Sequence, residues 1–493
     1  MAERREKRTH GERGWNMRRK WITRLAAWPL VLALLLSGAA GGASAAHAET
    51  AQQLEEVRQL LERYHLSRPE ESALNRAAIE GMIRALDDPY TEYLSPEEWE
   101  AYQKDLEQEF VGIGVYLTIH NQAVYITDVI PDSPAEKAGI RAGDTILEVD
   151  GKAVRTTDEA RNRLLGKAGT SVTVKVLRDG RELTIRVTRQ LIRLASVNGQ
   201  LMGDGVGYLA LTGFTSDAPA LFAERLRQLE GGGIKALIVD LRNNGGGYIE
   251  AAQKIASHFI KEGVLAHMIN RDGVDTPLTV SGTPRTYPVV LLVNEVTASA
   301  AELFAGALQD YGVARLVGRP TYGKGVTQLL IPLSGGGVLK VTTQEYLTPK
   351  NRKVEGIGLK PDIPVQGSAS QLVAAFRAAG GKTLQVSYTE GNVTVNGVRM
   401  RQSNALYYHN GAWYVNGHFA AAVLGAGIRY DAASRTVSLT RDGKSLTLRI
   451  DDKRLHVQNG VSAFDIRALA EWAPELRWNA EGNAVKLTLT AAG

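Results

Sequence analysis

The stretch ALIVDLRNNGGG, residues 236–247, begins with an unbroken apolar run and ends in three glycines. A short apolar run without alternation is typical of a strand buried on both faces, and such strands belong to parallel sheets covered by helices on each side. A second run of this kind, VVLLVN, occupies residues 289–294 and precedes a helical pattern that starts at about Ser299. Because strands and amphipathic helices alternate over residues 191–366, this part is predicted to be an α/β core.

The regions that flank this core have different patterns. Residues 49–105 show apolar residues at helical spacing, and residues 106–190 show short strands with two short helices. Residues 367–382 are predicted to be a linker with one short helix. Residues 383–493 contain two similar units about 49 positions apart, each a strand, a short helix and two further strands. The chain is therefore predicted to be an α/β multidomain protein.

Residues 1–48 have the pattern of an export signal. A basic run at residues 17–20 precedes an apolar stretch at residues 25–40, and Ala-His-Ala at residues 46–48 offers a cleavage site. An uncleaved membrane anchor is the alternative, although the apolar stretch is interrupted by Pro29 and is short for a span. In both cases the rest of the chain is expected to be exported.

The charge and cysteine content exclude several classes of function. The sequence pI of about 9.1 comes from the leader, because the remaining residues include 49 basic and 50 acidic side chains. This balance gives no support for a nucleic-acid partner. The absence of cysteine excludes a cysteine nucleophile, disulfides and thiolate metal sites. The nine histidines form no ligand-like pair, so no metal cofactor is expected.

Ser299 lies at the junction between the second apolar run and the helix that follows it. The first turn of a helix has N–H groups without intrahelical partners, and these donors can hold an oxyanion. Small residues around Ser299 leave room for a peptide to approach. Serine is also a common helix-capping residue, so its position alone leaves a purely structural role open.

Lys324 lies in GRPTYGKGVTQ, residues 318–328, which nearly spells a phosphate-binding P-loop. A P-loop requires Ser or Thr after the lysine and leads into a helix, whereas here Gly325 follows and the next residues are strand-like. Nucleotide binding is therefore disfavoured. A lysine among apolar residues and glycines can instead lose its proton through burial and act as the base for a serine. Gln328 is placed to accept a hydrogen bond from that amine. The alternative is that Lys324 is an ordinary loop lysine with no catalytic role.

The glycines at residues 245–247 let backbone N–H groups face a ligand at close range, or else form a flexible turn. Gly247, Ser299 and Lys324 each follow the end of a predicted strand. The carboxyl ends of parallel strands lie at one edge of a sheet, where the sites of α/β proteins assemble. The sequence therefore predicts one site made from these three positions.

The motifs of residues 70–366 together resemble the C-terminal processing peptidases, also called tail-specific proteases. They occur in the order typical of the family: GMIRALDDPYTEYLSPEE, FVGIGV, SPAEKAGIRAGDTILEVDG, DLRNNGGG, TASAAE, GRPTYGKGVTQ and EGIGLKPDI. The resemblance implies a crotonase-like α/β core with an inserted PDZ domain at residues 106–190. Many members have Pro at the position of Gly246 and Ser at that of Ala301, and neither change removes a catalytic group.

The resemblance also implies roles for individual residues. Ser299 would be the nucleophile, Lys324 the general base, and Gln328 the group that orients the lysine. The N–H groups of Gly247 and Ala300 would form the oxyanion hole. The implied chemistry requires no cofactor.

A PDZ domain implies a peptide receptor. The loop of Val111, Gly112, Ile113 and Gly114 would bind a free C-terminal carboxylate while the peptide adds to a sheet edge. The expected partners are therefore proteins with exposed apolar C-terminal tails. The helical region at residues 49–105 resembles a part of the family that often forms homodimers.

Residues 383–493 resemble the stalk-type domain named after the N-terminal part of copper amine oxidases. The resemblance implies no copper here, because His409, His418 and His456 form no ligand motif. Contact with the cell envelope, a spacer role and a dimer contact are all open for this region.

The sequence thus predicts an exported serine endopeptidase that recognises protein tails and hydrolyses peptide bonds. The alternative is a non-catalytic tail-binding or envelope scaffold that has kept the fold. Such a scaffold need not retain Ser299, Lys324 and Gln328 together. A nucleotide-dependent protein is the third class, and it would need nucleotide to protect Lys324.

Overall fold

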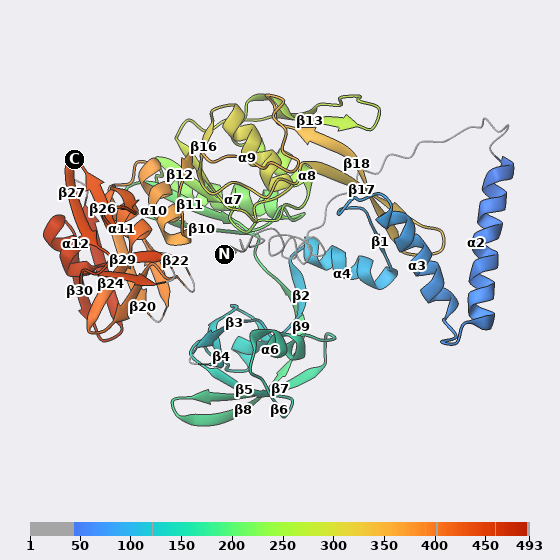
Figure 1. The fold of residues 1–493 in the computed structure, drawn as a ribbon, viewed down its shortest axis with the longest axis horizontal. Helices are drawn as coiled ribbons and strands as arrows, with labels where there is room; N and C mark the ends of the chain where they lie inside the picture. The colour runs from blue at the N-terminus through green and yellow to red at the C-terminus, as the bar shows by residue number, and fades with distance from the viewer. Residues whose placement is uncertain (1–43, 121, 390, 401–402, 459, 491–493) are drawn as a thin grey trace, which may run out of the picture. The chain divides into compact units, whose positions relative to one another are not determined.

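The computed structural model describes residues 44–120, 122–389, 391–400, 403–458 and 460–490. The predicted leader lies outside this part, except that its last residues begin helix α2. The described residues divide into two compact units, one within residues 98–195 and the other made of the described residues before 98 and after 195. Figure 1 shows the elements of both units, coloured along the sequence.

A six-stranded sheet forms the core that the sequence predicts for residues 191–366. Its order is β10-β11-β12-β15-β16-β19; β10 is antiparallel to β11, and the other neighbours are parallel. The two apolar runs of the sequence are the adjacent strands β12 and β15, and both are buried throughout. The strands are β10 (Val197–Leu201), β11 (Val206–Leu211), β12 (Ala236–Asp240), β15 (Val289–Val293), β16 (Ala314–Gly318) and β19 (Ile363–Pro364).

Helices cover both faces of this sheet, as the buried strands require. On one face, Leu237 and Leu291 share a core with helices α7 (Ala218–Gly231), α8 (Ile249–Ala256) and α9 (Ala300–Asp310). Their neighbours Ile238 and Leu292 point to the opposite face. Figure 1 shows α7 and α9 beside the sheet. The predicted helix after the second apolar run is therefore confirmed, with Ser299 as its capping residue.

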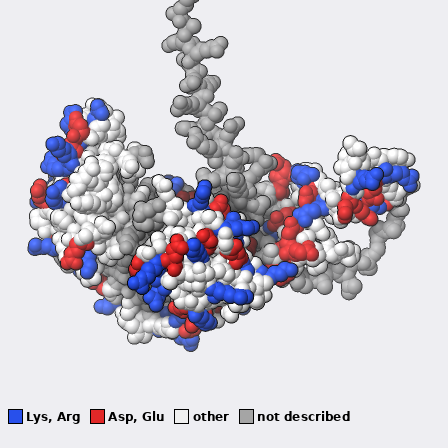
Figure 2. Space-filling model, turned by 90° about the horizontal axis from the view of Figure 1, so that it is seen from below, with Lys and Arg blue, Asp and Glu red and all other residues white. Residues whose placement is uncertain are grey.

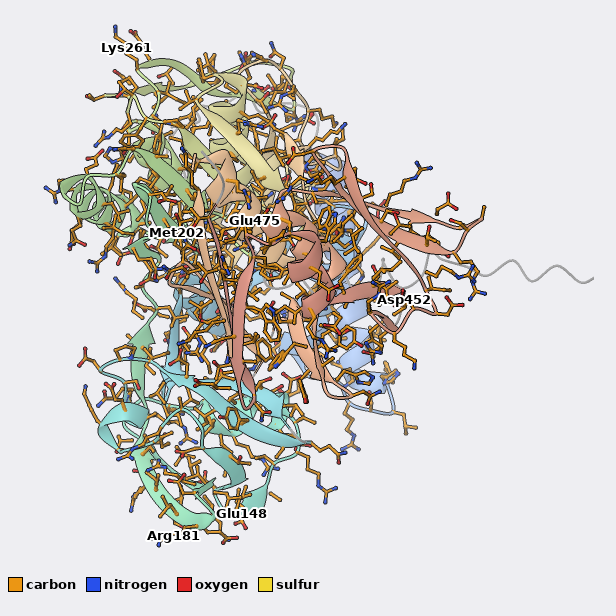
Figure 3. All side chains as sticks on the ribbon, turned by 90° about the vertical axis from the view of Figure 1, so that its left-hand side faces the viewer. Glu148, Arg181, Met202, Lys261, Asp452 and Glu475 are labelled. Carbon is orange, nitrogen blue, oxygen red and sulfur yellow. The ribbon has the colours of Figure 1, made fainter. Side chains whose placement is uncertain are left out.

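The opposite face is covered by α10 (Ser368–Ala378), which lies in the segment predicted to be a linker. The expected helix is present, but it is a buried part of the fold rather than a tether, because Leu372 and Phe376 are fully buried against the sheet. The same core continues into residues 383–490 and includes Met202, labelled in Figure 3. The C-terminal repeats and the sheet therefore share one hydrophobic core.

A second, antiparallel sheet joins segments that are far apart in the sequence. Strand β18 pairs with β1, β13 and β17, and β13 also pairs with β14. The presence of β1 differs from the purely helical pattern predicted for residues 49–105. The strands are β1 (Glu92–Leu94), β13 (Glu262–Asn270), β14 (Leu278–Ser281), β17 (Val326–Pro332) and β18 (Val338–Leu347).

The N-terminal region contains helices α2 (Ser44–Tyr64), α3 (Glu71–Arg84) and α4 (Pro96–Leu106). The predicted apolar stripes are present, but many of their side chains are solvent-exposed in the single chain. The exposed apolar residues of this region are Leu54, Val57, Leu60, Leu61, Tyr64, Leu66, Met82 and Leu86.

Residues 98–195 form a small unit of strands with the two short helices that the sequence predicts. Its sheet has the order β3-β4-β5-β7-β8, with β6 on β5, and β2 pairs with β9. The core consists mainly of alternate strand residues such as Val124, Ile126, Val172 and Val174. The elements are β2 (Glu109–Gly112), β3 (Val115–His120), β4 (Ala123–Val129), α5 (Pro134–Lys137), β5 (Thr145–Val149), β6 (Lys152–Ala153), α6 (Thr157–Leu164), β7 (Ser171–Arg178), β8 (Arg181–Thr188) and β9 (Gln190–Arg193).

The C-terminal part contains two copies of a strand–helix–strand–strand unit, as the sequence repeat predicts. The first copy is β24 (Ala412–Asn416), α11 (Gly417–Leu424), β25 (Gly427–Asp431) and β26 (Thr436–Arg441). The second is β29 (Val461–Asp465), α12 (Ile466–Trp472), β30 (Arg477–Glu481) and β31 (Ala484–Thr490). The remaining strands are β20 (Thr383–Thr389), β21 (Asn392–Val395), β22 (Val398–Met400), β23 (Leu406–His409), β27 (Lys444–Arg449) and β28 (Leu455–Gln458).

The surface in Figure 2 carries interspersed positive and negative side chains on the face shown. Among the described residues, no helix has both the length and the apolar character needed to cross a membrane. Within the same residues, no group of three or more His, Asp or Glu side chains is arranged to hold a metal ion.

Candidate active site

Ser299 lies between strand β15 and helix α9 with φ of 56° and ψ of −122°. A positive φ is unfavourable for a residue with a side chain, and such strain persists only where neighbours impose it. The Ser299 N–H donates to Glu302 Oε2 at 3.0 Å, and its carbonyl accepts from the Leu303 N–H at 2.9 Å. The side chain of this residue is nearly buried, at 6% exposure. The backbone is thus held in a conformation that the sequence pattern alone does not specify.

The glycine loop after β12 lies directly against Ser299. A Cβ placed on Gly246 would lie 2.9 Å from the Ser299 Cβ, and one on Gly247 would lie 2.5 Å from the Phe214 carbonyl oxygen. These positions have φ of 107° and 128°. Only glycine combines this backbone conformation with so close an approach.

Two N–H groups at this place have no protein acceptor in the described part of the chain: those of Gly247 and Ala300. Gly247 forms a parallel bridge with Phe214 in which Phe214 N–H donates to Gly246 and Tyr248 N–H donates to Phe214. In such a bridge the central residue directs its own N–H away from the partner. The geometry therefore leaves the donors predicted for an oxyanion hole available to a ligand.

Lys324 lies between β16 and β17 with its side chain buried, at 1% exposure. Its amine has no hydrogen-bond partner among the described residues and lies 5.0 Å from the centroid of the Tyr90 ring. Burial, together with the positive charge of Lys340, lowers the pKa of Lys324 to about 7, although the carboxylates of Glu92 and Glu355 oppose the shift. A large fraction of the amine is therefore neutral at physiological pH.

Gln328 lies on β17 and is also buried, at 3% exposure. Its Nε2 donates to Thr342 Oγ1 at 3.2 Å, whereas its Oε1 has no partner among the described residues. The predicted hydrogen bond from the Lys324 amine to this oxygen is not formed here, so both atoms are unpaired. Catalytic hydrogen bonds are often absent from ligand-free sites and form once substrate is bound.

Glu302 joins the nucleophile loop to the lysine loop, a role that the sequence pattern does not assign to it. Its carboxylate accepts four hydrogen bonds, from Ser299 N–H at 3.0 Å, Thr321 Oγ1 at 2.5 Å, Gly323 N–H at 2.7 Å and Lys324 N–H at 2.8 Å. The pKa of Glu302 is raised to about 7, because the effect of burial exceeds the opposing effect of these donors. The Ser-x-x-Glu spacing signals a helix-capping contact, but nothing in it indicates the three donors beyond the helix.

Tyr346 is a second bridge that the sequence did not reveal. Its hydroxyl lies 3.1 Å from the Ser299 carbonyl oxygen and 2.9 Å from the Lys324 carbonyl oxygen. Ser299 and Lys324 therefore share two buried partners, the Oε2 of Glu302 and the hydroxyl of Tyr346. This arrangement brings the two predicted catalytic residues together.

Two asparagines clasp the loops that follow β12 and β15. The Asn243 N–H donates to Asn294 Oδ1 at 2.9 Å, and Asn294 Nδ2 donates to Asn243 Oδ1 at 3.0 Å. Nearby, the Thr297 hydroxyl donates to the Leu241 carbonyl at 2.8 Å, and the Ala298 N–H donates to the Asn244 carbonyl at 3.0 Å. The glycine loop and the nucleophile loop are thus fixed to each other.

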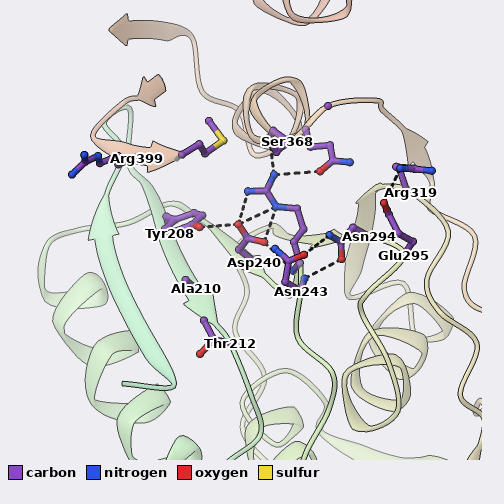
Figure 4. A pocket seen from close by; sticks show the side chains of 14 residues that line it. Tyr208, Ala210, Thr212, Asp240, Asn243, Asn294, Glu295, Arg319, Ser368 and Arg399 are labelled. Atoms are coloured by element: carbon purple, nitrogen blue, oxygen red, sulfur yellow. Dashed lines mark hydrogen bonds and ion pairs between the residues drawn. The ribbon is translucent and has the colours of Figure 1, made fainter. Parts of the chain in front are cut away.

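The clasp faces a polar pocket of about 510 Å³ on the α10 side of the sheet (Figure 4). On its wall, Arg242 binds the carboxylate of Asp240 and the Ser368 carbonyl, while Arg319 binds Glu295. The guanidinium of Arg242 thereby connects the carboxyl end of β12 to the start of α10. The lining residues are Tyr208, Ala210, Thr212, Asp240, Arg242, Asn243, Asn294, Glu295, Arg319, Gly367, Ser368, Gln371, Arg399 and Met400.

In the unit of residues 98–195, the predicted carboxylate loop runs from β2 to β3. Val111 and Gly112 end β2, and the carbonyls of Ile113 and Gly114 accept from Ala135 and Ile130. Gly114 has φ of 89°, and a Cβ there would lie 2.4 Å from the Ser133 Cβ. The N–H groups of Ile113 and Gly114 have no acceptor in the described part of the chain, so they are available to a ligand.

Comparison with known proteins gives three matching family models. Residues 205–365 match peptidase family S41, residues 111–188 match the PDZ domain, and residues 394–471 match the copper amine oxidase N-terminal domain. The described residues of the last region include no metal-binding cluster.

Curated relatives match over most of the chain. A probable CtpA-like serine protease of Staphylococcus aureus (strain COL) is 32% identical over 346 residues, which are 69% of this chain and 69% of the relative. The protein of that description from Staphylococcus saprophyticus is 32% identical over 73% of each chain. Among solved structures, the photosystem II D1 C-terminal processing protease is 30% identical, covering 65% of this chain and 88% of its own, with a TM-score of 0.42. The chain therefore belongs to peptidase family S41, as a CtpA-like serine protease that carries a PDZ domain.

Proposed function

We propose that this chain is an exported endopeptidase that receives unstructured protein tails through its PDZ domain and cleaves them with Ser299 and Lys324. The observation that carries the proposal is the shared anchoring of these two residues by Glu302 and Tyr346, with the Lys324 amine buried and unpaired among the described residues. A serine nucleophile requires a base that takes its proton, and a neutral lysine amine can serve as that base.

In the first half of the reaction, Ser299 Oγ attacks the carbonyl carbon of the scissile bond, and its proton passes to the neutral Lys324 amine. The carbonyl oxygen becomes an oxyanion, which accepts hydrogen bonds from the Gly247 and Ala300 N–H groups. The lysine ammonium then gives its proton to the leaving nitrogen, and the C–N bond breaks. Gln328 orients the lysine through its amide oxygen.

In the second half, Lys324 takes a proton from a water molecule as the water attacks the acyl-enzyme carbonyl. The tetrahedral intermediate collapses, Ser299 regains a proton from the lysine, and the product leaves as a carboxylic acid that loses its proton to solvent. Each half-reaction returns the amine to its neutral form, so the lysine is ready for the next half-reaction.

Substituting the two reactive groups tests this mechanism. Ser299→Ala and Lys324→Ala should each abolish cleavage of an unfolded, tail-bearing protein, while circular dichroism and peptide binding stay unchanged. The non-catalytic scaffold predicts no cleavage by the unaltered chain under any condition. Normal turnover in either variant would exclude the proposed pair.

Tail recognition is supported by the N–H groups of Ile113 and Gly114, which no described acceptor occupies. A labelled apolar peptide with a free C-terminal carboxylate should bind more tightly than its C-terminal amide, because only the carboxylate accepts from both donors. Equal affinity of the two peptides would contradict carboxylate recognition by this loop.

The remaining expectations concern export and assembly. The leader at residues 1–48 supports export, which cell fractionation checks. The exposed apolar residues of α2 and α3 support a homodimer, which light scattering of the full chain checks. Contact with the cell envelope through residues 383–493 is a further proposal, tested by envelope binding of the full chain.

A further inference from the structure

The wall over the Lys324 amine comes from a segment outside the α/β core. Residues 88–94 follow α3 and contain strand β1. Within them, the Tyr90 ring centroid lies 5.0 Å from Lys324 Nζ, and Tyr90 itself is 9% exposed. The aromatic ring therefore takes a place where water would otherwise solvate the amine.

Hydrogen bonds hold this segment firmly in place. The Tyr90 N–H and the Thr91 hydroxyl both donate to the Asp88 carboxylate, at 2.9 Å and 2.5 Å. The Thr342 N–H, from the strand that also pairs with Gln328, donates to Thr91 Oγ1 at 3.1 Å. The wall is thus built into the same sheet that carries the predicted orienting residue.

A second buried lysine lies on the adjoining strand and is not used by the proposed mechanism. Lys340 is 2% exposed, and its amine forms an ion pair with Glu92, its register partner on β1. The two charges act on Lys324 in opposite directions: Lys340 favours the neutral amine, and Glu92 favours the ammonium.

Other charged groups face the same space. Asp88 and Glu355 favour the protonated form of Lys324. Glu355 also accepts from the Gly325 N–H at 2.7 Å, and its own pKa is raised by burial. Burial is the largest cause of the raised pKa of the Tyr90 phenol. The neighbouring groups Glu355, Tyr322, Glu302 and Asp88 raise it as well.

We propose that residues 88–94 are a working part of the catalytic centre: Tyr90 keeps water from the Lys324 amine, and the Lys340–Glu92 ion pair sets the electrostatic potential at that amine. Tyr90, Lys340 and Glu92 act through Lys324 and are positioning residues. The inference rests on the proposed role of Lys324 as the base.

The test is a direct titration of the lysine amines in the full chain. Lysine labelled with ¹³C at Cε is introduced into the Ser299→Ala protein, and Lys324→Arg and Lys340→Met identify the two buried signals. The chemical shift of Lys324 is followed from pH 5 to pH 11, and the shift of Lys340 reports in the same spectra whether that amine stays charged.

The charge variants should move the Lys324 midpoint in opposite directions. Lys340→Met should raise it and Glu92→Gln should lower it, each by about half a unit or more. Lys175→Met and Glu182→Gln, which alter a partly exposed ion pair on β7 and β8, serve as matched controls and should leave the Lys324 midpoint in place. If Lys340→Met lowers the Lys324 midpoint or leaves it unmoved, the proposed electrostatic role of the Lys340–Glu92 ion pair is wrong.

The role of the Tyr90 ring is tested with one conservative and two disruptive substitutions. Tyr90→Phe should keep the midpoint, since the ring still excludes water, whereas Tyr90→Ala and Tyr90→Leu should raise it toward that of a hydrated lysine. Circular dichroism confirms that each variant is folded. An unmoved midpoint in both disruptive variants would refute the role of Tyr90.

Activity profiles of the same substitutions in the chain with Ser299 separate this inference from the proposed function. If Lys324 is the base, the pH at half-maximal kcat/KM moves with the measured midpoint. If the midpoint moves and the activity profile does not, the role of the segment stands and the role of Lys324 as base fails.

Discussion

The two sides of the site differ in how their polar groups are paired. Around the nucleophile, the side chains of Asn244, Thr297 and Glu302 each make at least two hydrogen bonds. Around the base, the Lys324 amine and the Gln328 amide oxygen are buried without partners among the described residues. On the nucleophile side, called the saturated side below, these buried side chains are all paired. On the base side, called the unsatisfied side, two buried polar atoms have no partner among the described residues.

The difference separates positioning from reactivity. Saturated networks of buried hydrogen bonds fix geometry, because every alternative arrangement leaves a polar group unpaired. An unpaired buried amine instead loses its proton, because the charged form is the one that burial penalises. The fold thus fixes the position of Ser299 and keeps the Lys324 amine neutral. Separate substitutions should therefore disrupt these two properties one at a time.

The largest expected effect comes from breaking the saturated side at Glu302. Glu302→Gln replaces one oxygen with an NH₂ group that faces two donors, and each lost acceptor costs about 1–3 kcal/mol. Cleavage should fall about 100-fold or more, with a lower midpoint of urea unfolding. Glu295→Gln, which alters an exposed carboxylate on the loop that precedes α9, is the control and should change stability by less than about 1 kcal/mol.

The second-largest effect is expected on the unsatisfied side, where the buried Lys324 amine should lower the free energy of unfolding. Because the pKa of Lys324 is about 7 in the folded chain, against 10.5 for an ordinary lysine, the unfolded chain binds more protons between these values. The contribution of Lys324 to stability should therefore rise with pH across this window. Lys324→Met should abolish cleavage yet stabilise the fold by about 3 kcal/mol at pH 8, a gain that shrinks toward pH 10.5. Urea unfolding at several pH values measures it; a pH-independent gain would contradict the burial of a neutral amine.

A smaller effect is expected at Gln328. Gln328→Glu places a carboxylate beside the amine, which favours the ammonium and should move the activity profile toward alkaline pH by about one unit. Gln328→Met removes the accepting oxygen without adding charge, so it should lower kcat and leave the profile in place. Identical pH–activity profiles for the two variants would show that the side chain at position 328 does not act on the Lys324 amine.

The sequence specifies the parts of this site that follow local rules. Apolar runs predict the buried strands β12 and β15, and strand ends place Gly247, Ser299 and Lys324 at one edge of the sheet. The role of Glu302 in the lysine loop, the bridge made by Tyr346 and the wall made by Tyr90 depend on contacts between distant segments. No periodicity or spacing encodes such contacts.

The helices that cover the six-stranded sheet were also only partly predictable from the sequence. A strand buried on both faces requires a layer on each side, and the sequence supplies an obvious layer on one side only. The second layer is α10, whose short apolar pattern between glycines is locally that of a helix within a linker. Its burial depends on the C-terminal repeats, which complete the core against the sheet.

The smallest expected effect concerns the clasp of Asn243 and Asn294. Both side chains face the polar pocket, so water can replace part of what each substitution removes. Asn294→Ala and Asn243→Gly, the latter keeping the positive φ of 62°, should each lower kcat about three- to tenfold with little change in KM. If the clasp acts as one unit, the double variant should lose no more than the worse single variant. Additive losses would mean that the two loops are aligned independently, and that the saturated side is held by Glu302 and Tyr346 without the clasp.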